Sequence, residues 1–287
     1  MKSITFFAQK GGVGKTTLCL NLAAMLAAER RRVLVIDLDR NRSASNYVDA
    51  GVGFEASVAA ALLGVCPLDQ LLRPIVPNLW LAPGAPELAL LETVTGVPDP
   101  ERATPDGHLS ENALAVELRR PGLATLDYVL IDCPGGHPYM ERLALLASDA
   151  VIAVTGLSLM DLNAAEPALH QVLRAQHLRG GRPSFLGFLP NEVRKPGMPP
   201  DLQAYLEGLG YPWFTPVRLS AQLRAAISAR RVEHRFIRSR WQDPAAQSLF
   251  QVAREIDLGI DAARRLPPFV WPLPKYAAGA SGGHPGQ

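Results

Sequence analysis

Short apolar runs alternate with longer segments of helical pattern along most of the chain. Runs of strand length lie near 3–8, 33–38, 79–82, 127–132, 150–155, 184–190 and 213–217. Segments of helical pattern lie near 16–30, 110–119, 138–147, 163–178, 199–208, 220–238 and 244–258. Nearly continuous apolar strands that alternate with helices predict an α/β fold: a doubly wound, mostly parallel sheet with helices on both faces.

Length and composition indicate one domain. A chain of 287 residues with 48% hydrophobic residues is large enough to bury a single extended core. We therefore expect one α/β domain over residues 1–266, followed by a Pro/Gly-rich tail over residues 267–287. The segment 93–108 contains several prolines and glycines, which predicts an exposed loop.

The connection between the first strand and the first helix has a pattern typical of phosphate binding. Residues 10–17 read Lys10-Gly11-Gly12-Val13-Gly14-Lys15-Thr16-Thr17. Glycines allow consecutive backbone amides to turn toward phosphate oxygens at the positive end of the following helix. Lys15 is then expected to neutralise the β- and γ-phosphates, and the Thr16 hydroxyl to coordinate magnesium. We predict that all eight residues bind ATP.

Two further apolar runs end in carboxylates. One run is followed by Asp37 and Asp39, and the other ends at Asp132. Ligands of open α/β sheets bind at the carboxyl ends of strands, where these side chains are expected to lie. An Asp-x-Asp pair at a strand end is also a common way to begin a loop.

The early Lys10, with Gln9 where the general phosphate-loop pattern has glycine, resembles the ParA/MinD family of dimerising ATPases. The resemblance implies that Lys10 reaches the phosphates bound by a partner subunit, and that Lys10, Lys15 and Asp39 are catalytic, with Asp39 guiding the attacking water. It also implies magnesium held at Thr16, Asp37 and Asp132. Two departures concern the neighbouring loops: 40–42 is Arg-Asn-Arg where the family often has Pro-Gln-Gly, and Gly135 replaces the usual second proline.

The base pocket is expected by the same resemblance at Asn191, Pro216 and Arg218. An asparagine can donate to and accept from one adenine edge, although an asparagine after a strand is also a common turn residue.

A stripe of arginines indicates a possible DNA-binding surface. The net charge of +2 identifies no partner, but Arg224, Arg231, Arg235 and Arg238 share one face if 220–238 is helical. Such a stripe can follow a phosphate backbone without reading sequence. A solvated helix face with local ion pairs is the alternative.

Together these residues and the resemblance predict an ATPase with ATP and Mg²⁺ as cofactors. It would form a homodimer with ATP, bind non-specific DNA, and hydrolyse ATP slowly until stimulated by an adaptor of the ParB type or one linked to its cargo. The alternatives are a MinD-like membrane-associated regulator and a metabolic ligase of the dethiobiotin synthetase type. The first strand begins at the N-terminus, and no run reaches membrane-spanning length, which predicts a cytoplasmic, nucleoid-associated protein without a membrane partner.

Overall fold

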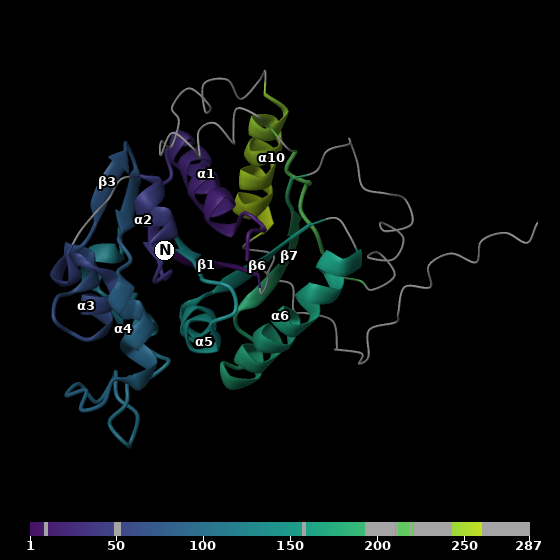
Figure 1. The fold of residues 1–287 in the computed structure, drawn as a ribbon. Helices are drawn as coiled ribbons and strands as arrows, with labels where there is room; N and C mark the ends of the chain where they lie inside the picture. The colour runs from purple at the N-terminus through teal and green to yellow at the C-terminus, as the bar shows by residue number, and fades with distance from the viewer. Residues whose placement is uncertain are drawn as a thin grey trace, which may run out of the picture.

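A seven-stranded sheet forms the centre of the computed structural model, which describes residues 1–8, 11–48, 53–156, 159–192, 210, 212–218, 220 and 243–259 (Figure 1). The strands are β1 (Lys2–Phe7), β2 (Val33–Asp37), β3 (Arg73–Val76), β4 (Leu79–Ala82), β5 (Tyr128–Asp132), β6 (Ala150–Thr155) and β7 (Ser184–Pro190). Their spatial order is β3-β4-β2-β5-β1-β6-β7. Only the edge strand β3 is antiparallel to its neighbour. The predicted mostly parallel α/β sheet is confirmed.

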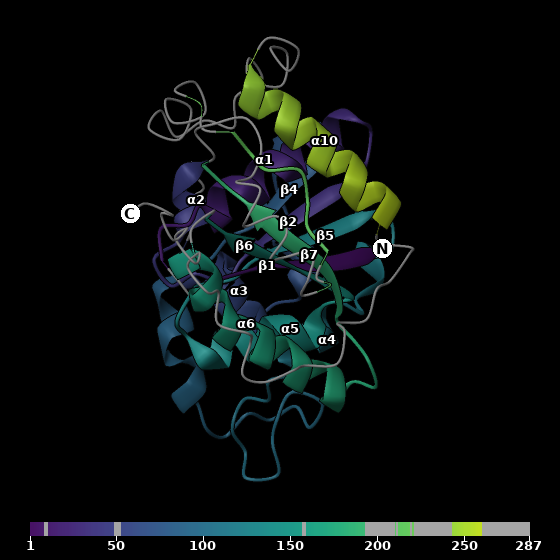
Figure 2. The ribbon, with the colours of Figure 1, turned by 90° about the vertical axis from the view of Figure 1, so that its right-hand side faces the viewer.

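Helices cover both faces of this sheet. They are α1 (Lys15–Ala28), α2 (Ser43–Tyr47), α3 (Val58–Leu62), α4 (Ala113–Glu117), α5 (Pro138–Ala147), α6 (Leu159–Leu178) and α10 (Pro244–Gly259). Short 3₁₀ helices are η1 (Phe54–Ala56), η2 (Leu68–Gln70), η3 (Pro86–Thr93) and η4 (Pro121–Leu123). Figure 2 shows α1 and α10 on one side of the sheet and α4, α5 and α6 on the other. Within the described ranges, no helix combines the length and apolar character needed to cross a membrane.

Alternation along the central strands builds two separate cores. In β5, Val129 and Ile131 join the core beneath α3 to α6, whereas Leu130 joins the core beneath α1 and α10. In β1, Ile4 and Phe6 both face the α1 side. Because successive strand side chains point to opposite faces, a strand buried on both faces must be apolar throughout, as the sequence pattern indicated.

The sequence-based elements agree with the structure except near the edges of the sheet. The strand predicted at 213–217 is wrong: the segment runs beside β7, but its only bridge to it in the described residues joins Trp213 to Phe188. The antiparallel β3 was missed because it is short, contains Pro74 and is largely exposed. The helices predicted at 199–208 and 220–238, and the tail 267–287, lie outside the described residues.

The segment 93–108 is more firmly attached than a fully exposed loop. Arg102 is 3% exposed, and its guanidinium forms an ion pair with the fully buried Glu117. Arg102 also donates a hydrogen bond to the carbonyl of Ala61 at 2.7 Å. The prediction of an exposed loop is therefore wrong at this position, because a buried ion pair holds the segment against α3 and α4.

Candidate functional site

The loop between β1 and α1 has the backbone geometry of an anion-binding turn. Gly12 has φ 77° and Gly14 has φ 89°, values that favour glycine. Gly14 is the N-cap of α1, so no side chain satisfies the first amide groups of the helix. Those amides and the helix dipole favour an anion at this position. Lys15, the first residue of α1, is 8% exposed.

The early residues of the motif are not all described. The structure places residues 11–14 as a loop and residues 15–17 in the first turn of α1, while Gln9 and Lys10 lie outside the described residues. The predicted role of Lys10 across a dimer therefore stays a prediction.

The two carboxylates Asp37 and Asp132 lie side by side at the carboxyl ends of neighbouring strands. They are register partners in the parallel pair of β2 and β5, and both are buried. Asp37 accepts hydrogen bonds from the amide and the hydroxyl of Ser45 at 2.8 and 2.7 Å, and from the amide of Asp39 at 3.0 Å. Burial raises the pKa of Asp37 in spite of these bonds.

Asp132 differs because nothing in the described residues satisfies it. Neither of its carboxylate oxygens accepts a hydrogen bond with good geometry from the part of the chain that the structure describes. Burial raises the pKa of Asp132, and the negative charge of Asp37 raises it further, while the Thr16 hydroxyl and the Lys15 charge act in the opposite direction. A buried carboxylate without partners is unfavourable in an isolated protein, so this position is suited to a cation.

The donor set fits magnesium. This ion takes oxygen ligands, keeps several waters and uses one or two carboxylates in phosphate sites. Asp132, the Thr16 hydroxyl and Asp37 provide such oxygens beside the phosphate loop. Within the described ranges, no group of three or more acidic, histidine or cysteine side chains is arranged to hold a metal by itself, so the Thr16 hydroxyl, phosphate oxygens and water would have to complete the coordination here.

Asp39 organises the loop after β2. Its carboxylate accepts hydrogen bonds from the amide of Asn41 at 2.9 Å and from the hydroxyl of Ser43 at 2.6 Å. Arg42 has φ 58°, a left-handed conformation, at the place where the family pattern has glycine. Arg42 thus adopts a backbone conformation that glycine adopts easily, although it is not a glycine. This conformation costs about 1 kcal/mol for a residue with a Cβ.

Two supporting residues of this site carried no signal in the sequence. The Ser45 hydroxyl donates to Asp37 and accepts a hydrogen bond from the amide of Gly84 at 3.0 Å. A Cβ on Gly84 would lie 2.9 Å from the Asp37 carbonyl oxygen, so only glycine fits there. Ser45 follows Asp37 by eight residues, whereas Gly84 lies much further along the chain and only the folded sheet brings it to the site.

The residues predicted to surround the base are close to the phosphate loop. Asn191 is 8% exposed, and its side-chain amide donates a hydrogen bond to the Val13 carbonyl at 2.9 Å. The amide of Val217 donates to the Pro190 carbonyl at 2.8 Å, which brings Pro216 and Arg218 to the end of β7. Asn191 is thus hydrogen-bonded to the phosphate loop itself, and its contact with a base stays a prediction.

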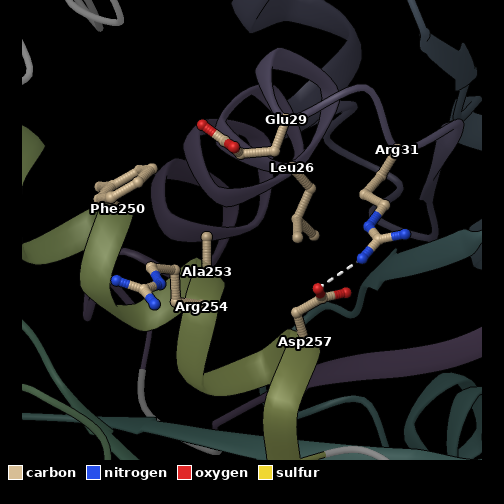
Figure 3. A pocket seen from close by; sticks show the side chains of 7 residues that line it. All are labelled: Leu26, Glu29, Arg31, Phe250, Ala253, Arg254 and Asp257. Carbon is tan, nitrogen blue, oxygen red and sulfur yellow. Dashed lines mark hydrogen bonds and ion pairs between the residues drawn. The ribbon is translucent and has the colours of Figure 1, made fainter.

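A small hollow lies past the carboxyl ends of β2 and β5. It has a volume of about 90 Å³ and lies between the loop after β2 and the loop after β5, with Asp39, Gly135, Gly136 and His137 in its walls. A larger hollow of about 380 Å³ lies between α1 and α10, next to the Arg31–Asp257 ion pair (Figure 3). Its residue Leu26 is about 16 Å along α1 from Lys15, at a rise of about 1.5 Å per residue. The larger hollow is therefore separate from the phosphate loop.

A family model described as an AAA domain, AAA_31, matches residues 1–179. The chain belongs to this AAA domain family. The match includes the phosphate loop and both carboxylate-bearing strands of the AAA domain, which the structure brings together.

Relatives of this AAA domain include chromosome-partitioning proteins. ParA of Myxococcus xanthus is 35% identical over 152 residues, which cover 50% of this chain and 48% of the relative. Soj of Thermus thermophilus is 36% identical over 154 residues, or 53% of each chain. The chain spans about half the length of the curated relatives it matches. The predicted resemblance to the ParA/MinD type is confirmed.

Solved structures share the fold over nearly the whole chain. Apo McdA of Cyanothece has a TM-score of 0.72 at 18% identity, covering 89% of this chain and 98% of McdA. MinD of Pyrococcus horikoshii, complexed with Mg-ADP, has a TM-score of 0.68 at 22% identity, covering 89% and 96%. Cobyrinic acid a,c-diamide synthase of Mycobacterium smegmatis, with bound ADP and magnesium, has a TM-score of 0.71 at 21% identity, covering 94% and 99%. The same fold thus occurs in positioning proteins and in a synthase.

The predicted DNA-binding arginines Arg224, Arg231, Arg235 and Arg238 lie outside the described residues. Their arrangement on one face stays a prediction from the sequence.

Proposed function

We propose that this protein is a partition or positioning ATPase that binds ATP and Mg²⁺, dimerises with ATP, and binds non-specific DNA as a dimer. Hydrolysis, slow alone and stimulated by an adaptor protein, then releases it from the DNA. The protein would act in the cytoplasm at the nucleoid and position a plasmid, a chromosome or a protein cargo. The observation that carries the nucleotide part is Asp132, a buried carboxylate without partners beside a glycine-capped helix N-terminus.

Each group at the site has a chemical task in this proposal. The amides at the start of α1 and the Lys15 ammonium hold the phosphates, and Thr16, Asp37 and Asp132 hold the magnesium ion. The bound ion would neutralise charge on the β- and γ-phosphates. Asp39, in the wall of the small hollow, would orient water toward the terminal phosphate.

Lys10 completes the site in this proposal. It would contribute a positive charge to the phosphates of the partner subunit, as an arginine finger does in other phosphoryl-transfer enzymes. ATP occupancy and dimer formation would then depend on each other.

The fold alone does not separate this function from a ligase, because a cobyrinic acid synthase shares it. The relatives that match in sequence at 35% and 36% identity are both chromosome-partitioning proteins, which favours partition. A stoichiometric small-molecule acceptor consumed with ATP, in the absence of any protein partner, would instead support the ligase. ATP-dependent sedimentation with liposomes would support the MinD-like alternative.

DNA binding in different nucleotide states tests the proposal directly. We expect retention on non-specific duplex DNA with ATP only, and a steep loss as salt rises, because phosphate contacts release counterions. Replacing Arg235 and Arg238 together by alanine should reduce the salt slope by about 2, one for each lost phosphate contact. The matched control replaces Arg119 and Arg182, whose side chains are 65% and 63% exposed, and should leave the slope unchanged.

Equal DNA binding with ATP, with ADP and without nucleotide would contradict the switch. Lys10→Ala should abolish stable ATP dimers and hydrolysis while the monomer stays folded. An active, dimerising Lys10→Ala variant would contradict the role of Lys10 in the partner's site.

A further inference from the structure

A buried glutamate beside the phosphate site has no task in the proposed mechanism. Glu141 lies in the first turn of α5, and its side chain is 1% exposed. One carboxylate oxygen, Oε1, accepts a hydrogen bond from the amide of Gly136 at 2.8 Å. The other oxygen, Oε2, is buried and accepts no hydrogen bond from the described residues.

A simple helix cap accounts for only half of this arrangement. A glutamate in the first turn of a helix often reaches back to an amide before the helix, as the Glu141 side chain does here. Such caps usually lie in water, whereas the Glu141 carboxylate is withdrawn from it. Burial raises the pKa of Glu141, although the amides of Gly136 and His137 and the charge of Lys15 act against this rise. A buried, half-satisfied carboxylate is an unfavourable way to cap a helix, which indicates a second role for Glu141.

The position of Gly136 suggests that role. Residues 133–137, which we call the switch loop, join Asp132 at the end of β5 to α5. Gly136 and His137 line the small hollow opposite Asp39. Lys15 lies near enough for its charge to act on Glu141. The amide held by Glu141 therefore belongs to a residue in the wall of the hollow that also contains Asp39, and under the function proposed above we expect the terminal phosphate to point toward this hollow.

We propose that Glu141 is a positioning residue that holds the Gly136 amide in the nucleotide-free protein and releases it when the terminal phosphate of a triphosphate binds. The proposal rests on the function proposed above. An amide carries a single hydrogen, so the carboxylate and a phosphate oxygen compete for the same donor. Two anions at that amide repel each other, particularly in a site from which water is excluded.

This competition distinguishes a triphosphate from a diphosphate. A diphosphate has no terminal group to approach the switch loop, so Glu141 keeps the amide. A triphosphate gains the amide only by displacing Glu141, which lowers the affinity for ATP relative to ADP. Replacing the charged acceptor by a neutral one of the same shape should therefore increase the preference for the triphosphate.

The test compares wild-type protein with Glu141→Gln, and uses Glu111→Gln as the matched control. Glu111 pairs with Arg142 of the same helix at 2.5 Å and is one-third exposed, so its replacement removes an equal charge outside the hollow. Affinities for ADP and for a slowly hydrolysed ATP analogue are measured by titration calorimetry with magnesium. We expect the ratio of ADP to ATP-analogue dissociation constants to rise by about threefold to tenfold in Glu141→Gln, because a bond to a neutral acceptor is weaker. The ratio in Glu111→Gln should equal that of the wild type.

A second measurement follows the amide itself. Hydrogen exchange at Gly136, observed with glycine-labelled protein, should be slow in the nucleotide-free wild type and at least about tenfold faster in Glu141→Ala. Thermal unfolding shows whether each variant remains folded, and Glu141→Gln covers the case in which the alanine variant does not.

Several outcomes would overturn the proposal. An unchanged ratio in Glu141→Gln, or an equal change for both nucleotides, would show that Glu141 does not compete with a terminal phosphate. Fast exchange at Gly136 in the wild type would show that the amide is not held. If the wild type binds neither nucleotide, the proposed function fails and the release step fails with it, while normal binding with an unchanged ratio removes only the role of Glu141.

Discussion

Two carboxylates of this protein are buried to the same degree and yet differ in every contact. Glu117, at the end of α4, is fully buried and pairs with Arg102 and with Arg120, the latter at 3.0 Å. It also accepts a hydrogen bond from the amide of Leu68 at 2.7 Å. Asp132, at the end of β5, is 1% exposed and accepts no hydrogen bond from the described residues.

The difference separates a structural carboxylate from one that we propose binds a ligand. A buried ion pair that is complete within the chain holds segments together, as Glu117 and Arg102 hold the segment 93–108 against α3. A buried carboxylate that is incomplete within the chain destabilises the isolated protein and is satisfied when a cation binds. Burial alone therefore does not identify a site; the missing partners do.

The largest expected effect is the loss of the complete network. Glu117→Ala leaves the Arg102 guanidinium buried without its main partner and should reduce the free energy of unfolding by about 3–5 kcal/mol. Urea denaturation followed by circular dichroism measures this loss. The control Glu101→Gln breaks an ion pair with Arg119 whose members are 68% and 65% exposed, and should change stability by less than about 0.5 kcal/mol. A loss in Glu117→Ala as small as the control's would show that the network is dispensable.

The opposite effect is expected at the incomplete carboxylate. Asp132→Asn removes a buried charge while keeping the side-chain shape, so the nucleotide-free protein should become more stable by about 1–2 kcal/mol. The same variant should lose magnesium-dependent ATP binding. Denaturation in the presence of a chelator and calorimetric titration with Mg-ATP measure the two effects. A destabilised Asp132→Asn protein, or one that binds Mg-ATP normally, would contradict the assignment.

The pH dependence provides a check on the same residue. The pKa of Asp132 is raised in the folded protein, so the folded state holds a proton that the unfolded chain releases above about pH 4. The raised pKa therefore does not reduce the stability of the folded state below about pH 4. As the pH rises from there toward the native pKa of Asp132, the wild type loses stability. The stability advantage of Asp132→Asn over the wild type should therefore grow between about pH 4 and neutrality. An advantage that is constant over this range would indicate an unshifted carboxyl group.

The smallest effect is expected at an ion pair that is partly exposed to solvent, unlike the buried Glu117 and Asp132. Asp257 of α10 accepts hydrogen bonds from Arg31 at 2.6 Å and from the Tyr128 hydroxyl at 2.5 Å (Figure 3 shows the Arg31 contact). Burial opposes the ionisation of Asp257, but these two bonds outweigh it and lower the pKa of Asp257. Arg31 is 44% exposed, so solvent screens the pair and Arg31→Ala should reduce stability by at most about 1 kcal/mol. Nucleotide affinity should be unchanged, since Arg31 follows the C-terminal end of α1, whereas Lys15 is at the N-terminal end of that helix.

The sequence predicted most of the central sheet because buried parallel strands must be apolar on both faces. β1, β2, β5, β6 and β7 were located by that pattern to within one or two residues. The pattern failed at β3, whose exposed side chains carry no such signal, and at 213–217, where an apolar segment packs beside β7 without forming a strand. Edge segments are decided by what lies next to them, which local composition does not contain.

By itself the sequence determined the phosphate loop and the carboxylates at the strand ends, because their chemistry requires fixed residue types at fixed spacing. Only the tertiary structure decided that Asp37 is satisfied by Ser45 while Asp132 is left without a partner, and that Glu141 holds the switch loop. These contacts form only when the loops and helices that carry the partners have packed against the sheet, and burial acts on a charge only once that packing has excluded water.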